Sequence, residues 1–307
     1  MPARLLFAAA VLLLLSTACG GASQEDGPGN ASDSLAGTAP GTDIYLASLE
    51  RVGDTLRLGP PQNVTQRPGY DNQPAFARGG GAIVYTAVRE GQTDVVRYAL
   101  DADARRTLTD TPQSEYSPTP RPDDRMTLVR VEDDGRQRLW QYSAFGLPAA
   151  PVFADRDAIG YHAWLDSARV ALFVLGEPPA LHLANSRTDS AAVITEGIGR
   201  SLQPIPNANA ISFVAVAPDS TTAIHRLDLD GTTRRLTDPP ASGRGVDHAW
   251  MPDGTLLMAE GTLLYAWTPA HDGWRAVANV APLEPSRLAV SPDGRTLALV
   301  AQDTPPQ

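Results

Sequence analysis

The chain closes with "AVSPDGRTLALVAQ", Ala289 to Gln302. Ser-Pro-Asp-Gly is typical of a tight turn, and the apolar run after it is typical of a buried β-strand. Only a short polar tail, residues 303–307, follows this run. A sheet unit that begins with this turn therefore stops after two strands, and its other strands must come from elsewhere in the chain.

The pattern around this turn recurs along the sequence. The residue before the turn, Val290, has equivalents at five earlier positions: Phe76, Pro120, Trp164, Pro206 and Trp250. From Phe76 to Val290, successive positions are 44, 44, 42, 44 and 40 residues apart. Each unit continues with an apolar strand, an alternating strand and a polar strand, as in "AIVYTAV", "DVVRYALD" and "RRTLTD". Four strands repeated at this period predict an all-β fold, a six-bladed β-propeller.

The missing strands of the last unit match the beginning of this region. "DIYLASL" (Asp43 to Leu49) matches the third strand "DVVRYAL", and "DTLRLG" (Asp54 to Gly59) matches the fourth strand "RRTLTD". We therefore expect strands from both ends of the chain to close the sixth blade, which removes exposed sheet edges. Residues 43–307 are expected to form this single six-bladed propeller.

These repeats resemble those of TolB-type propellers. The resemblance is carried by "QPAFARGGGAIVYTA", "DHAWMPDGTLLMA", "HRLDLDGTTRRLTD" and "AVSPDGRTLALV", and it extends over residues 43–307. It implies a six-bladed fold and a binding role in the bacterial cell envelope. The resemblance is to the propeller half of TolB alone, because a short tether precedes the propeller where TolB has a further domain.

The first 42 residues have the pattern of a bacterial lipoprotein. Arg4 precedes an apolar run, Leu5 to Leu15, that is too short to span a bilayer, and "LSTAC" ending at Cys19 resembles a lipobox. We expect residues 1–18 to be a signal peptide and Cys19 to carry the lipid. Residues 19–42, rich in Gly, Ser, Ala and Pro, are expected to form a disordered tether. A plain secretory signal with an incidental cysteine is the alternative.

Composition and motifs exclude several functions. The formal net charge is −10, so the surface should repel nucleic acid. All 25 basic residues are arginine, which excludes chemistry that needs a lysine amine. No "GxSxG" elbow occurs, and the five histidines form no HxH or HExxH pair that would indicate zinc. The single cysteine excludes an internal disulfide.

The loops that lead into the first strands are expected to surround one mouth of the central channel. They carry the candidate partner-binding residues Tyr70, Asp71, Glu115, Tyr116, Tyr161, His162, Arg200, Asp247, His248 and Arg287. Polar and aromatic groups gathered at a concave site indicate ligand binding. The competing interpretation is that the Asp and His residues hydrogen-bond neighbouring blades and hold the ring together.

The sequence therefore predicts a lipid-anchored, monomeric envelope protein that binds a protein, peptide or glycan and needs no cofactor. The membrane would be contacted through the lipid alone, on the periplasmic or outer-membrane side. The alternative is a calcium-dependent, lactonase-like hydrolase. Its ion would lie in the channel, held by Asp71, Glu115, Asp247 and His248, because calcium prefers several oxygen ligands. A purely architectural role is the third hypothesis.

Overall fold

The computed structural model describes residues 41–53, 55–121, 123, 125–240, 247–270 and 273–302, all within one compact unit of the chain. In these ranges the regular structure is β-strand, without a helix. The described residues accordingly hold no helix that is long and apolar enough to cross a membrane. The predicted signal peptide (1–18), Cys19 and the predicted tether up to residue 40 lie outside the described residues.

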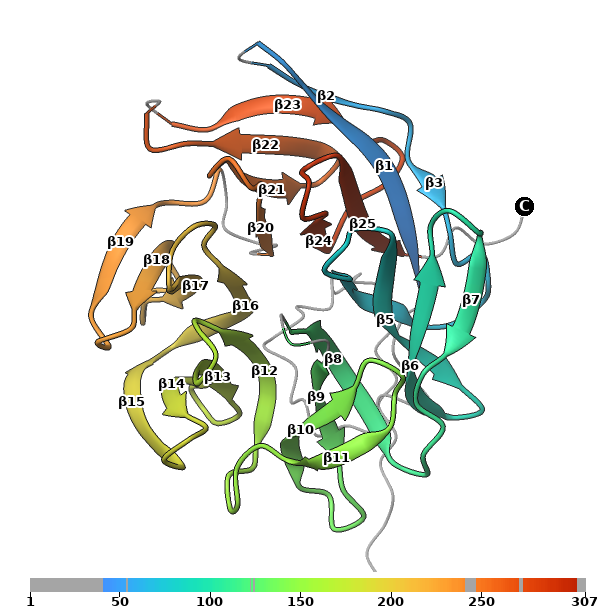
Figure 1. Cartoon of the computed structure of the whole chain (residues 1–307). Coiled ribbons are helices and arrows are strands. Elements are labelled where there is room, and N and C mark those ends of the chain that lie inside the picture. The colour runs from blue at the N-terminus through green and yellow to red at the C-terminus, as the bar shows by residue number, and fades with distance from the viewer. Residues whose placement is uncertain are drawn as a thin grey trace, which may run out of the picture. The chain divides into compact units, whose positions relative to one another are not determined.

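The strands form six antiparallel sheets, which are the blades of a propeller (Figure 1). Within each blade the strands are given from the innermost outward. Blade one is β4 (Asp71–Phe76), β5 (Ala82–Arg89), β6 (Gln92–Ala99) and β7 (Ala104–Thr107). Blade two is β8 (Ser114–Pro120), β9 (Arg125–Val131), β10 (Gln137–Ser143) and β11 (Pro148–Pro151). Blade three is β12 (Ile159–Trp164), β13 (Arg169–Val174), β14 (Ala180–Asn185) and β15 (Ser190–Glu196).

The remaining blades follow the same order. Blade four is β16 (Ile198–Pro204), β17 (Ala210–Val216), β18 (Thr222–Asp228) and β19 (Thr233–Thr237). Blade five is β20 (His248–Trp250), β21 (Leu256–Glu260), β22 (Leu263–Trp267) and β23 (Arg275–Asn279). Blade six is β24 (Arg287–Val290), β25 (Thr296–Gln302), β1 (Thr42–Val52) and β2 (Thr55–Leu58), with β3 (Gln62–Asn63) also paired to β1.

Blade six confirms the predicted closure by both ends of the chain. Its order is β24-β25-β1-β2, and β1 pairs with β25 from Thr42 opposite Gln302 to Ser48 opposite Thr296. The innermost strands contact one another in the sequence β4, β8, β12, β16, β20, β24, and β24 contacts β4 again. The ring is therefore closed, with blade six completing it next to blade one (Figure 1).

The residue before the turn, whose equivalents define the repeat, is the last residue of the innermost strand in five blades, from Phe76 in β4 to Val290 in β24. Blade four departs from the predicted position. There β16 ends at Pro204, and the backbone hydrogen bond that closes the turn runs from Ile205 N to Ala210 O. The equivalent bond in blade five runs from Met251 N to Thr255 O, and it begins at the residue after Trp250. Pro204 is thus the true equivalent, and Pro206 lies two residues beyond it, inside the turn.

The hydrophobic core consists of six clusters, and each lies between two adjacent blades. The second strand of a blade is covered on both faces by its neighbours, so it reads as a continuous apolar run. In β5 the first six residues, Ala82 to Ala87, are all buried. The outermost strand is an edge exposed to solvent, which explains why β7 and β19 are rich in arginine.

The Ser-Pro-Asp-Gly turn of blade six is fixed by its own side chains. The hydroxyl of Ser291 donates to Oδ1 of Asp293 at 2.6 Å and accepts from the backbone N–H of Thr296 at 2.8 Å. Gly294 has φ of +71°, and a Cβ there would lie 3.0 Å from Cδ of Pro252 in the equivalent turn of blade five. Glycine at this position therefore also allows the turns of blades five and six to approach closely.

Candidate functional site

The innermost strands line a central cavity of about 440 Å³, and each of the six blades contributes to its wall. The ten predicted residues divide into two groups. Five line this cavity: Tyr161, His162, Arg200, Asp247 and Arg287. Five are not part of its wall: Tyr70, Asp71, Glu115, Tyr116 and His248.

Arg287, the first residue of β24, is the centre of a polar cluster in the cavity. Its Nη2 donates to the hydroxyl of Tyr161 at 3.0 Å, and its guanidinium carbon lies 5.2 Å from the centre of that ring. Its Nη1 lies 3.4 Å from Oδ2 of Asp247, whose other oxygen accepts from the hydroxyl of Ser201 at 3.4 Å. Arg287 and Asp247 are 9% and 7% exposed. Tyr161 on β12 and Asp247, the residue before β20, therefore hold this buried arginine in place.

Arg200 on β16 is the exposed member of the cluster, and its Nη2 contacts the backbone oxygen of Ser286 at 3.4 Å. Burial would raise the pKa of the Tyr161 hydroxyl, but the positive charges of Arg287 and Arg200 together lower it. Burial raises the pKa of Asp247, and the same two arginines oppose that rise. Both guanidinium groups thus act on the same phenol and carboxyl group.

Tyr70 lies close to this cluster although it is not part of the cavity wall. Burial raises the pKa of its hydroxyl, while the neighbouring charges of Arg287 and Arg200 oppose the rise. Tyr116 and Tyr161 also interact electrostatically with Tyr70. The structure thus brings three predicted tyrosines and two predicted arginines into one neighbourhood.

His162 forms a link between blades two and three. Its Nε2 lies 2.8 Å from Oγ1 of Thr127 on β9, and Nε1 of Trp164 donates to the same hydroxyl at 3.0 Å. The imidazole is 6% exposed. Burial, together with the charge of Arg121, lowers the pKa of His162 to about 3, so the ring is neutral at physiological pH.

The second "HAW" motif repeats this contact between blades four and five. Nε2 of His248 lies 2.7 Å from Oγ of Ser212 on β17, and Nε1 of Trp250 donates to the same oxygen at 2.8 Å. His248 is fully buried. In both motifs one hydroxyl of the preceding blade joins a histidine and a tryptophan of the next blade, and we name these contacts the inter-blade links.

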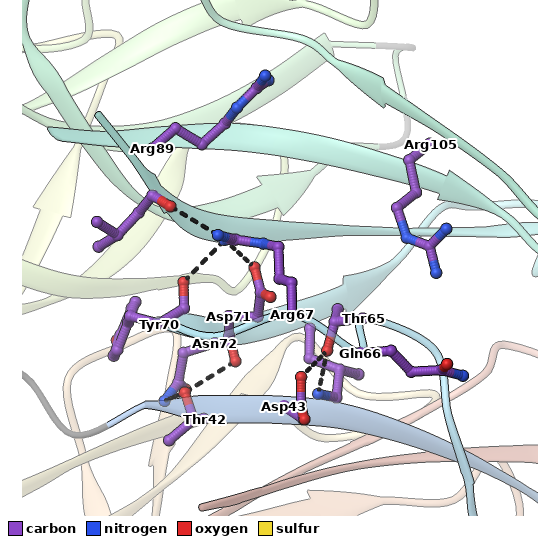
Figure 2. A network of polar contacts seen from close by, with 12 residues as sticks. Thr42, Asp43, Thr65, Gln66, Arg67, Tyr70, Asp71, Asn72, Arg89 and Arg105 are labelled. Carbon is purple, nitrogen blue, oxygen red and sulfur yellow. Dashed lines mark hydrogen bonds and ion pairs between the residues drawn. The ribbon is translucent and has the colours of Figure 1, made fainter. Parts of the chain in front are cut away.

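Asp71 belongs to the junction between blades six and one, shown in Figure 2. Its carboxylate is fully buried and accepts from Nη2 of Arg67 at 2.5 Å. Arg67 also donates to the backbone oxygens of Tyr70 and Val88, at 3.3 and 2.9 Å. The hydroxyl of Thr42, the first residue of β1, donates to the backbone oxygen of Asp71 at 3.0 Å. Asp71 therefore fastens the closing strand to blade one.

Glu115 lies at the boundary between blades one and two. Its Oε1 accepts from the hydroxyls of Thr111 and, at 3.1 Å, Tyr142, whereas its buried Oε2 has no hydrogen-bond partner. Burial raises the pKa of this carboxyl group to about 7, against the hydrogen bonds from Thr111 and Tyr142. Its side chain packs between blades instead of lining the channel.

The four residues of the calcium hypothesis are thus engaged in different places. Asp71 pairs with Arg67, Glu115 accepts from Thr111 and Tyr142, and the other two members, Asp247 and His248, contact Arg287 and Ser212. Over the described parts of the chain, no group of three or more His, Cys, Asp or Glu side chains is placed to hold a metal ion.

Sequence reasoning missed the partners that position these side chains: Thr127, Ser212, Ser201 and Arg67. The signal for the first two was available. "YHAW" and "DHAW" repeat at equivalent positions, and the innermost strand of a blade faces the second strand of the blade before it. Ser201 and Arg67 lie in stretches without a repeated motif, and their roles appear only in three dimensions.

Searches against protein-family models and among curated proteins find no match for the chain. Solved structures do match. A protein assigned to TolB from Agrobacterium tumefaciens is 12% identical, with a TM-score of 0.65 over 87% of this chain and 100% of that one. A gluconolactonase from Xanthomonas campestris is 10% identical, with a TM-score of 0.59 over 86% of this chain and 98% of that one.

A chain from a nidogen–laminin complex is 11% identical and has a TM-score of 0.55, over 85% of this chain and 98% of that one. At these identities the likeness shows the fold alone. It confirms the predicted six-bladed propeller and its resemblance to TolB-type propellers in architecture.

Proposed function

We propose that this chain is a cell-envelope protein that binds a partner at the mouth of its channel and carries out no chemistry. The Tyr161–Arg287–Asp247 cluster is the observation that carries the proposal. Tyrosine and arginine, with tryptophan, are the side chains most enriched among the residues that dominate binding energy at interfaces. Here the arginine is already held by Tyr161 and Asp247, so less side-chain entropy is lost when a partner binds.

The contacts of the remaining candidates favour binding over hydrolysis. His162, the imidazole in the cavity wall, already shares its Nε2 with the hydroxyl of Thr127. Its other nitrogen, Nδ1, is buried without a hydrogen-bond partner, and a general base needs a pKa near the working pH, whereas burial lowers the pKa of His162 to about 3. Asp247, the carboxyl group in the wall, contacts Arg287 at 3.4 Å. Both groups are therefore engaged in holding the site together.

The envelope location and the lipid anchor are part of the proposal and rest on the sequence of the first 42 residues. Cys19 would hold the propeller to the membrane by its acyl chains, and the tether would let the channel mouth reach a partner nearby. If so, Cys19→Ser should move the protein from the membrane fraction to the soluble fraction. Persistence of the variant in salt-washed membranes would contradict the anchor.

Partners of a protein, peptide or glycan class fit an open, polar and aromatic site. The nidogen–laminin structure supports a protein partner in general terms, because a propeller of this fold occurs there in a complex between proteins. We propose that this chain acts as a monomer, with the closed ring presenting one channel mouth to one partner.

Partner capture from envelope extract tests the proposal. Tyr161→Phe removes the hydroxyl that accepts from Arg287 but keeps the ring that packs against Phe173. We expect its capture of specific partners to fall while its melting temperature stays close to that of the parent. Arg234→Ala, an exposed arginine on the outermost strand β19, is the control. Equal capture by the parent and by Tyr161→Phe would overturn the proposal.

A further inference from the structure

The charge of the cavity is opposite to that of the chain. The formal net charge of the whole sequence is −10. Among the described residues of the cavity wall, the charged ones are Arg200, Arg287 and Asp247, which sum to +1. His162 adds no charge, because burial keeps its ring neutral. A basic site inside an acidic protein attracts anions and is not explained by overall composition.

Arg287, in the cavity wall, retains unused hydrogen-bonding capacity. Two of its terminal nitrogens contact Tyr161 and Asp247, but its Nε is buried and has no hydrogen-bond partner. The contact to Asp247 is long for an ion pair, at 3.4 Å, so it satisfies this guanidinium only in part. A buried donor without an acceptor is unfavourable, and an acceptor supplied by a ligand would relieve it.

Arg200 supplies a second guanidinium to the same place. It comes from β16, it is exposed, and its contact to the backbone oxygen of Ser286 uses one of five N–H groups. Its charge acts on Tyr161 and Asp247, as does that of Arg287. A buried arginine that is held in place beside an exposed one is an arrangement that can take an anion from solvent and hold it.

We propose that the channel mouth binds a carboxylate group of its ligand between Arg200 and Arg287, with the Tyr161 hydroxyl beside it. This inference rests on the proposed function and specifies its ligand chemistry. Guanidinium groups match a planar carboxylate through paired N–H···O bonds, and such charge-assisted bonds are stronger than neutral ones. A peptide carboxylate, a uronic acid or a small organic acid can each present this group.

Calorimetric titration of the full chain in detergent tests the proposal with three matched pairs of probes. These are triglycine and its C-terminal amide, galacturonate and galactose, and succinate and succinamide. We expect at least one acid to bind about tenfold more tightly than its neutral counterpart. The pair that discriminates identifies the source of the carboxylate. If none of the three acids exceeds its neutral counterpart, the proposal is wrong.

Two variants locate the effect. Because Arg200 is exposed, the Arg200→Gln variant should fold, and it should lose the preference for the acid. Arg234→Gln on β19 is the control and should keep that preference. Arg287→Gln combined with Asp247→Asn removes both buried charges together, so no unpaired carboxylate remains. It should also lose the preference. A preference that survives in Arg200→Gln and in the double variant would overturn this site. Channel-dependent partner capture without any carboxylate preference would refute this inference alone and leave the proposed binding function standing.

Discussion

Replacing Glu115 by glutamine tests whether this carboxyl group is a buried element of the blade boundary. Its pKa is raised to about 7 in the folded protein, from 4.5 in the unfolded chain. As pH rises from 4.5 to 7, the unfolded chain loses this proton first, so the free energy of unfolding falls. The full slope is about 1.4 kcal/mol for each pH unit, and the whole interval corresponds to about 3 kcal/mol.

The assay is urea unfolding of the parent and of Glu115→Gln at pH values between 4.5 and about 8. Any fixed effect of the amide is independent of pH, so only the change with pH is interpreted. We expect the variant to gain about 3 kcal/mol relative to the parent across this range and then to keep a constant difference. Glu50→Gln, the same replacement at an exposed position on β1, is the matched control. A constant difference between the parent and Glu115→Gln throughout would refute the reasoning.

Three further predictions follow from the ring and its channel. Ser212→Ala should lower the free energy of unfolding by about 2–4 kcal/mol, because it leaves Trp250 and His248 without their shared hydroxyl, whereas Ser212→Thr should cost much less. Thermal melts decide this, and equal melting of Ser212→Ala and the parent would show that the inter-blade link is unimportant. Deleting residues 43–59 should leave blade six with β24 and β25 alone and cause aggregation or a large loss of stability, and a deletion variant that melts like the parent would contradict closure by both ends. Calcium should leave the melting temperature unchanged, whereas a calcium site would add about 2.7 kcal/mol at 100 times its dissociation constant. A calcium-dependent rise that is lost in Asp247→Asn would favour the hydrolase hypothesis.

The fold could be predicted because its determinants are local and repeated. The Ser-Pro-Asp-Gly turn, the apolar second strand and the polar fourth strand each follow from short-range chemistry, and the period places them in register. In blade four the predicted position of the residue before the turn was wrong by two residues, because "PIPNANA" lacks the Asp-Gly pair. Both Pro204 and Pro206 could then precede the turn, and only the backbone bonds of Ile205 show which one does.

The candidate site could be predicted less completely, because the order of the loops does not say which way a side chain faces. Neighbouring residues on a regular strand point to opposite faces, yet Tyr161 and His162 both line the cavity, whereas neither Glu115 nor Tyr116 does. The innermost strands also contain register shifts, as between Tyr116 and Thr119 in β8, which change the alternation. Sequence patterns therefore identified residues near the axis, whereas the register shifts, which change the way side chains face, could not be predicted from the repeat.

Site-specific photo-crosslinking tests most directly whether the channel is the place where a partner binds. A photoreactive residue would replace Gln203, which lines the cavity from β16, and in a second protein Arg234 on the outermost strand β19. After irradiation of cells that produce each protein, we expect a discrete crosslinked species from position 203, reduced by Arg200→Gln, and none from position 234. Crosslinking at position 234 without any at position 203 would contradict a binding site in the channel.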